Sequence, residues 1–267
     1  MKIVRCFLLL LSIFGMIAVL LYDKGIPAGG GTYASFEGKG TAEDPCLIPD
    51  KEALETLRDL VNEGEAFEGI YFRQSDDIDL EEEEWIPIGV FGSGNYFGGI
   101  YDGGAHRIMN LRVSAGINGF PSNGGLFGVL DGTVRNLGIE SGLIEGDYVG
   151  AITSHGTSRA MILNCYNKAT VRGTGRAGGI VDNLGEGAVI NCVNFGQVEA
   201  PVSACAVSYD AGWIISVYPH ERACTDYFTG SFFAGVMEGN SPQELLNAGI
   251  EMLVEEGIIR KEDVAVW

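Results

Sequence analysis

The chain has 267 residues, 17 basic and 36 acidic side chains, a net charge of −19 and 40 glycines. With 46% apolar residues and no Gly-X-Y period, this composition excludes collagen and a disordered chain, and it favours one domain rich in tight turns and short strands. The negative charge argues against binding to nucleic acid or to an anionic bilayer surface, because both need clustered Lys and Arg side chains.

The N-terminal segment 1–22 differs from the rest of the chain. Two basic residues precede an apolar run over 6–22, which is the pattern of an export signal. The run has a length between those of a cleaved signal peptide and a membrane anchor, so both interpretations stay open. The sequence therefore predicts an extracellular or cell-surface protein that contacts a membrane only through this segment. A Gly-rich linker is expected over 23–40.

A short N-terminal cap is expected over 41–80. Within it, apolar positions spaced three and four apart predict a helix over 51–63, with Asp50 as its N-cap and Gly64 at its end. Short strands are expected to follow this helix.

The segment 81–216 is repetitive. At nearly constant intervals, a strand-like stretch ends on an asparagine: Asn110, Asn136, Asn164 and Asn191. Units this small cannot bury an apolar face alone, so they must stack on one another. Short strands that pair with their counterparts one repeat later predict an all-β fold, a right-handed parallel β-helix of about four coils.

The four repeated asparagines are expected to lie at the same corner of successive coils. There, their side chains would form a structural ladder by hydrogen-bonding one another and the backbone. The alternative is that their amides bind sugar hydroxyls.

A C-terminal cap is expected over 217–267. Ser241 and Pro242 are typical of the first turn of a helix, and Gly257 is typical of its end. We expect this helical segment to cover the last coil, as the helix over 51–63 covers the first. Uncovered ends of a solenoid would offer open strand edges.

Several motifs, in this order, resemble the GLUG-repeat proteins. They are found at 40–48, 57–64, 77–80, 85–89, 97–111, 124–128 and 164–167. The resemblance implies a bacterial surface or secreted β-helix, often part of adhesin-like proteins, and it also occurs beside the catalytic part of IgA-specific zinc metalloproteases. The chain contains no His-Glu-x-x-His stretch, so the protease activity does not carry over. The family implies no agreed chemistry.

Acidic residues supply the candidates for a metal site. Asp77 and Asp79 alternate on one strand and precede four glutamates, so their carboxylates could bind Ca²⁺. The alternative is a solvated acidic turn. The three histidines are scattered and no Cys-x-x-Cys occurs, so the sequence predicts neither a structural zinc site nor another cofactor.

Two further patterns could indicate catalysis. Paired carboxylates could hydrolyse a glycosidic bond, with these candidates: Asp102, Asp131, Glu140, Glu145, Asp147 and Asp182. Their places in the repeats do not bring two of them together, so no catalytic residue is assigned. The run 173–178 matches Gly-x-Gly-x-x-Gly, but a strand rather than a helix is expected after it, so we interpret it as a turn.

Cysteines and aromatic residues have structural interpretations with functional alternatives. Cys165 and Cys192 occupy equivalent positions of successive repeats and should stack on neighbouring coils, either as buried thiols or as a disulfide. An early cluster of aromatic side chains could fill the first coil or stack on sugar rings: Tyr71, Phe72, Trp85, Tyr96, Phe97 and Tyr101.

Together these patterns predict an exported bacterial β-helix protein that acts at the cell surface as a non-catalytic binding or adhesion module. Its partner would be a surface glycan or protein that the sequence does not identify. The alternatives are a polysaccharide lyase or hydrolase built on a β-helix, and a passive spacer.

Overall fold

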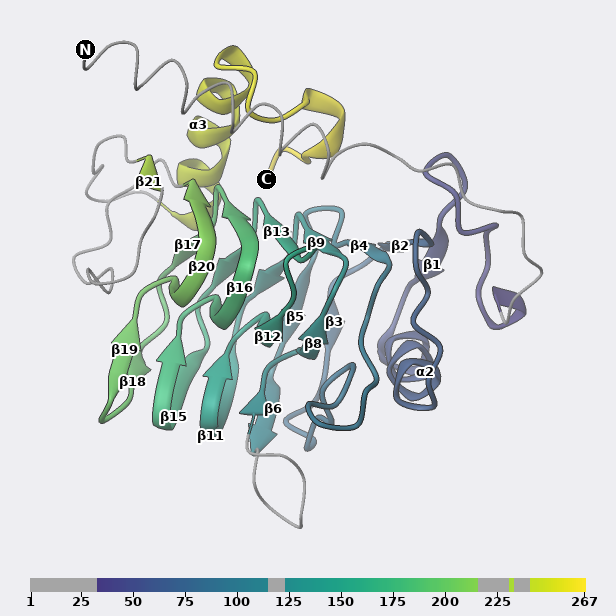
Figure 1. The fold of residues 1–267 in the computed structure, drawn as a ribbon. Helices are drawn as coiled ribbons and strands as arrows, with labels where there is room; N and C mark the ends of the chain where they lie inside the picture. The colour runs from purple at the N-terminus through teal and green to yellow at the C-terminus, as the bar shows by residue number, and fades with distance from the viewer. Residues whose placement is uncertain (1–32, 115–122, 216–230, 233–240) are drawn as a thin grey trace.

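All strand pairing in the described part of the chain is parallel, and it winds the chain into a β-solenoid of about five turns (Figure 1). The computed structural model describes residues 33–114, 123–215, 231–232 and 241–267. The predicted signal or anchor segment, most of the predicted linker and the start of the predicted C-terminal cap lie outside the described residues. Within the described residues, no helix is both long enough and apolar enough to cross a bilayer.

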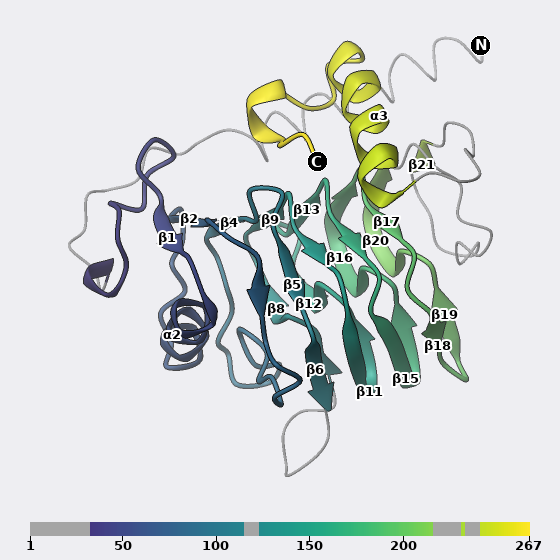
Figure 2. The same ribbon diagram turned by 180° about the vertical axis from the view of Figure 1, so that it is seen from behind.

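Three parallel sheets form the walls of the solenoid (Figures 1 and 2). The first sheet contains β1 (Cys46–Ile48), β2 (Tyr71–Gln74), β4 (Ile100–Asp102), β8 (Phe127–Leu130), β9 (Thr133–Arg135), β12 (Thr153–Gly156), β13 (Met161–Leu163), β16 (Val181–Ile190), β20 (Ser208–Ile215) and β21 (Ser231–Phe232). The second contains β3 (Ile78–Asp79), β5 (Arg107–Met109), β10 (Gly138–Ile139), β14 (Tyr166–Asn167) and β17 (Val193–Asn194). The third contains β6 (Leu111–Ser114), β7 (Asn123–Gly124), β11 (Gly142–Gly150), β15 (Thr170–Gly178), β18 (Val198–Glu199) and β19 (Ser203–Cys205).

A column of stacked side chains runs through the interior along the first sheet. The strand register places each of these residues beside the next: Cys46, Phe72, Tyr101, Val134, Ile162 and Val189. All six are almost fully buried. Because successive residues of a strand point to opposite faces, one inward residue per strand and turn is enough to build a continuous apolar core.

The solenoid has about five turns, whereas about four coils were expected, because strands before residue 81 take part in it. β1 and β2 stack in register with β4, which extends the first sheet toward the N-terminus. The stacked partners Tyr101 and Val134 are farther apart in the sequence than the later partners Ile162 and Val189. Helix α2 (Lys51–Asn62) fills the connection between β1 and β2, and the longer step from Tyr101 to Val134 breaks the interval, so a search for one fixed period does not find these turns.

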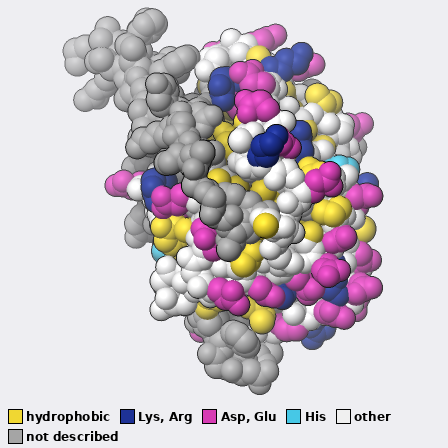
Figure 3. Space-filling model, turned by 90° about the vertical axis from the view of Figure 1, so that its right-hand side faces the viewer, with side chains coloured by type: hydrophobic (Ala, Val, Ile, Leu, Met, Phe, Trp, Pro, Cys, Tyr) yellow, Lys and Arg dark blue, Asp and Glu magenta, His cyan; other side chains and the backbone are white. Residues whose placement is uncertain are grey.

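Helix α2 (Lys51–Asn62) packs over the N-terminal end of the solenoid. The Asp50 side chain caps it by accepting a hydrogen bond of 2.9 Å from the backbone N–H of Ala53. One side of the helix, formed by Leu54, Leu57 and Val61, is buried in the main apolar core. The end of the molecule on which α2 lies carries more acidic than basic side chains at its surface (Figure 3).

Helix α3 (Pro242–Glu255) packs against the flank of the solenoid rather than only over its last coil. It begins with a capping box between Ser241 and Glu244, and its apolar face forms a second cluster with outward side chains of β13, β16 and β17. β13 and β16 carry apolar side chains on both faces, and such strands need a cover on both sides. The 3-10 helix η3 (Lys261–Asp263) follows α3. Residues 241–267, here called the C-terminal strap, lie across the ends of β9, β13 and β16 (Figure 1).

Candidate functional site

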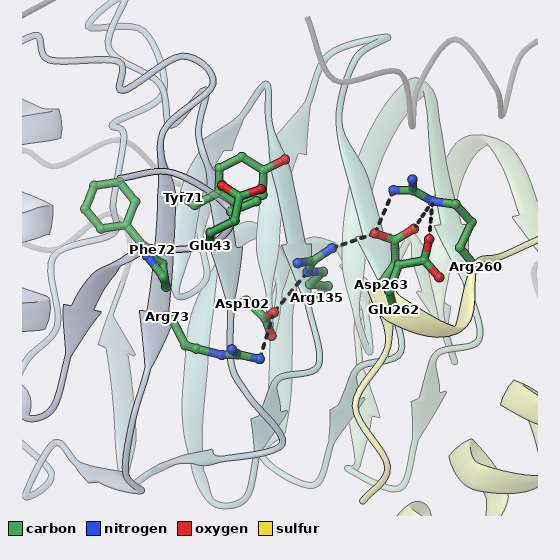
Figure 4. Close-up of a pocket in the computed structure, with 11 residues that line it drawn as sticks. Glu43, Tyr71, Phe72, Arg73, Asp102, Arg135, Arg260, Glu262 and Asp263 are labelled. Carbon is green, nitrogen blue, oxygen red and sulfur yellow. Dashed lines mark hydrogen bonds and ion pairs between the residues drawn. The ribbon is translucent and has the colours of Figure 1, made fainter. Parts of the chain in front are cut away.

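A pocket of about 390 Å³ opens between the first sheet and the C-terminal strap (Figure 4). Three parts of the chain line it: the residues just before β1, the strands β2, β4 and β9, and the strap around η3. In Figure 4, Tyr71 and Glu43 lie on one side of the pocket and Arg260 and Glu262 on the other. The pocket thus joins residues that are far apart in the sequence.

A chain of alternating charges crosses the pocket between these two sides. Arg135 donates hydrogen bonds of 3.2 Å to Asp102 and 3.1 Å to Asp263. Arg73 lies 3.6 Å from Asp102, and Arg260 donates a 2.7 Å hydrogen bond to Asp263, which raises the pKa of Arg260. The two aspartate side chains are only 9% exposed, whereas Arg73 and Arg260 are 51% and 54% exposed. The buried charges at the centre of the network are therefore all paired, and the two arginines at its ends face solvent.

Strand register explains the solenoid half of this network. Asp102 ends β4 and Arg135 ends β9, and the two residues are direct partners in the first sheet. Neighbouring positions on one face of a sheet bring opposite charges within contact distance. The Asp102 carboxylate also accepts hydrogen bonds from the backbone N–H of Gly104 and from the Asn136 amide. Asp102 is thus held in place at the corner where the first sheet ends.

Three of the predicted ladder asparagines meet at this corner. The Asn164 amide donates to Asn136 Oδ1 at 2.8 Å, and the Asn191 amide donates to Asn164 Oδ1 at 3.0 Å. All three have φ near +50°, a conformation that asparagine tolerates better than most residues. The ladder also holds the strap, because Asn164 donates to the carbonyl of Ala265 and Asn191 to that of Leu246.

The structure places Asn110 at a different corner, between β5 and β6. Its amide donates to Asp79 Oδ1 at 2.8 Å, and its Oδ1 accepts from Ser141. The step from Asn110 to Asn136 therefore joins two different corners of the solenoid, although it resembles the later steps in length. The φ of Asn110, +56°, is the same as that of Asn164, which is why the two positions carry the same residue type.

The two calcium candidates are engaged by protein donors. Asp77 accepts from the backbone N–H of Arg107 and pairs with its guanidinium at 3.0 Å. Asp79 accepts from Glu81 N–H and from the Asn110 amide, and these two hydrogen bonds lower the pKa of Asp79. In the described part of the chain, no three His, Cys, Asp or Glu side chains are grouped to hold a metal ion.

We expect millimolar Ca²⁺ to leave the melting temperature of the full chain unchanged. Binding to the native state alone would raise it, but here a cation would have to displace donors that already satisfy Asp77 and Asp79. Differential scanning fluorimetry with Ca²⁺ or with Mg²⁺ measures the effect. A rise specific to Ca²⁺ that the double variant Asp77→Asn/Asp79→Asn abolishes would contradict this prediction.

The carboxylates considered for catalysis are spread over the solenoid, and each has its own partner. Five of them lie outside the pocket, with these partners: Asp131 with Arg159 and Thr157, Glu140 with Lys168 and Tyr166, Glu145 with Arg172, Asp147 with Thr174, and Asp182 with Arg176. Asp102 is the one in the pocket, where a second carboxylate, Asp263, lies across the shared Arg135.

The Gly-x-Gly-x-x-Gly run is part of a strand, not a turn. It lies within β15, which pairs in parallel with β11 along most of its length. The glycines allow close approach of neighbouring backbone, since a Cβ atom on Gly178 would lie 1.8 Å from the carbonyl oxygen of Val181.

Most of the aromatic cluster fills the interior. Phe72, Trp85, Phe97 and Tyr101 are buried, whereas Tyr71 and Tyr96 are partly exposed. Tyr71 lines the pocket, so one aromatic ring of this cluster is placed to contact a ligand.

Cys165 and Cys192 are buried free thiols, and burial raises the pKa of Cys165 well above its usual range.

Sequence reasoning missed most of the pocket. Of its charged residues it identified only Asp102, as one of six dispersed carboxylates. The stacked pair of Asp102 and Arg135 is separated by the same long step as Tyr101 and Val134, so the regular interval of the later repeats does not predict it. Nothing in the sequence links Asp263 to this pair, because it lies 128 residues from Arg135.

Comparisons with known proteins give partial matches. No protein-family model matches the chain, so the resemblance to the GLUG-repeat proteins stays a prediction. The chain is 31% identical over 163 residues to halomucin of Haloquadratum walsbyi, and 32% identical over 120 residues to a protein of Evansella cellulosilytica named as a candidate Gly-rich membrane protein. These matches cover 57% and 42% of the chain but only 2% and 12% of the two relatives. The chain thus corresponds to a small part of either protein.

One solved structure is also similar. It is a candidate immunoglobulin A1 protease from Bacteroides ovatus, 19% identical in sequence, with a TM-score of 0.45. The similarity covers 82% of this chain and 90% of that one.

Proposed function

We propose that the chain is an exported, right-handed β-helix protein that acts at the cell surface as a non-catalytic binding module. The pocket between the first sheet and the C-terminal strap is its ligand site. The apolar segment over 6–22 supports export. The names of the two sequence relatives, a halomucin and a Gly-rich membrane protein, support a location at the surface or membrane.

One observation carries the proposal: solvent-facing donors and acceptors from both the solenoid and the C-terminal strap line the pocket. Arg73 and Arg260 present guanidinium groups at its two ends, and Glu43 and Glu262 present exposed carboxylates. Ligand sites combine a concave surface with a few convergent polar groups, and this pocket has both.

The arrangement of carboxylates favours binding over catalysis. A glycosidase needs one carboxyl group that donates a proton beside a second carboxylate. Asp102 and Asp263 instead accept hydrogen bonds from the same guanidinium, that of Arg135, which occupies the space between them. A β-helix lyase or hydrolase remains the alternative that the experiment below distinguishes.

The full chain, purified in detergent, is incubated with immobilised cell-wall and host-surface polysaccharides. Retained protein and newly released reducing or unsaturated ends are measured in the same samples. We expect retention on at least one polymer without release of ends. Release would overturn the non-catalytic assignment, and absence of retention on every polymer would favour a passive spacer. Surface labelling of intact cells tests the location, and exclusion of the chain from the labelled fraction would contradict it.

A further inference from the structure

We infer that the pocket takes a neutral saccharide unit rather than an acidic sugar or a metal ion. This inference rests on the proposed binding function and names the class of ligand. It follows from the charge, the shape and the hydrogen-bonding groups of the pocket.

The charge of the pocket disfavours ionic ligands. Three arginines and four carboxylates line it, which leaves one net negative charge. A uronate or a phosphate would meet this excess of carboxylates, although a site for anions needs the reverse. A divalent cation would need several convergent carboxylate oxygens, but Asp102 and Asp263 are each engaged by guanidinium groups.

The exposed groups match the hydroxyls of a sugar. Each hydroxyl both donates and accepts a hydrogen bond, so a ring with several hydroxyls pairs best with donors and acceptors in alternation. Arg73 can donate from the solenoid, and Glu43 and Glu262 can accept on opposite sides of the pocket (Figure 4). The neighbour of Arg73 in the network, the Asp102 carboxylate, lies 3.6 Å away, which leaves guanidinium N–H groups available to a ligand.

Tyr71 supplies the remaining part of such a site. Its ring is partly exposed on β2 and lines the pocket, while the next residue, Phe72, points into the core. An aromatic side chain offers an apolar face beside a polar tip, and this suits a sugar, which has an apolar face and a polar rim. A volume of about 390 Å³ lies in the lower part of the usual range for small-molecule sites and suits roughly one or two sugar rings.

The experiment measures binding of soluble tetrasaccharides to the full chain by isothermal titration calorimetry. The probes are neutral tetramers of glucose, mannose and galactose, and a tetramer of galacturonate. We expect at least one neutral tetramer to bind, and to bind more tightly than the galacturonate. Arg73→Ala and Tyr71→Ala should each weaken this binding about tenfold, since each removes one direct contact.

Arg112→Ala is the matched control. Arg112 is 52% exposed and pairs with Glu84 at 3.4 Å, so it resembles Arg73 in exposure and pairing but lies on β6, away from the pocket. The control should bind as the unchanged protein does, and circular dichroism should show all three variants folded. Glu262→Gln removes one negative charge from the pocket. It should therefore reduce the difference in affinity between the neutral tetramer and the galacturonate tetramer.

The results separate this inference from the proposed function. If polysaccharides retain the protein but Arg73→Ala and Tyr71→Ala leave retention unchanged, the binding function stands and the pocket is not its site. If the galacturonate tetramer binds more tightly than every neutral tetramer, the assignment of a neutral ligand is overturned. If no polymer and no tetramer binds, the chain does not bind glycans, and both this inference and a glycan-binding function are overturned.

Discussion

Replacing Phe72 with alanine should lower the free energy of unfolding by about 3–5 kcal/mol, the range measured for large-to-small changes in a tightly packed core. Phe72 is fully buried at the centre of the N-terminal turns. Its ring centroid lies 5.3 Å from that of Phe36, 5.0 Å from that of Phe67 and 5.9 Å from that of Phe97. The substitution therefore opens a cavity and removes three aromatic contacts at once. Urea unfolding of the full chain, followed by circular dichroism, measures the loss.

Tyr71→Ala is the natural control for this change. Tyr71 precedes Phe72 on β2, and its side chain lies on the opposite, partly exposed face of the strand. We expect a loss of less than about 1 kcal/mol, as is usual for surface substitutions. Equal losses for the two variants would contradict the assignment of Phe72 to the core and of Tyr71 to the pocket.

The sequence was sufficient to predict the solenoid because its later turns are regular. The inward residues Ile162 and Val189 recur at the same interval as Asn164 and Asn191, so the strand pairing could be inferred from spacing alone. The first turns are hidden for two reasons: helix α2 occupies the connection between Cys46 and Phe72, and the step from Tyr101 to Val134 is longer than the others. A helical pattern followed by a change of interval predicts a cap rather than further turns.

The pocket could not be predicted in the same way, because it depends on how the C-terminal strap docks. β13 and β16 carry apolar residues on both faces, and this pattern indicates that something must cover their outer side. It does not indicate which segment does so, or that Asp263 arrives beside Arg135. The prediction of one ladder formed by all four asparagines was partly wrong for a related reason. A backbone with positive φ favours asparagine at both Asn110 and Asn164, but of these two only Asn164 contacts the C-terminal strap.

The second large effect should come from Asn164→Gly, which we expect to lower the free energy of unfolding by about 2–4 kcal/mol. Glycine keeps the backbone at positive φ without strain, and the flexibility that it adds to the unfolded chain is the same in the comparison variant Asn110→Gly. The buried Asn164 amide donates to Asn136 and to the carbonyl of Ala265, and it accepts from Asn191. Its loss leaves the Ala265 carbonyl without this donor and breaks the ladder at its centre, where the strap is attached.

Asn110→Gly provides the comparison, because Asn110 has the same φ of +56° but bonds to Asp79 and Ser141 near the surface. We expect it to cost less than about 1 kcal/mol, since solvent can replace these partners. Limited proteolysis adds a second measurement: Asn164→Gly should speed cleavage within the C-terminal strap, whereas Asn110→Gly should not. If both variants lose the same stability, the four asparagines act alike, as the spacing alone suggested, and the ladder does not hold the strap.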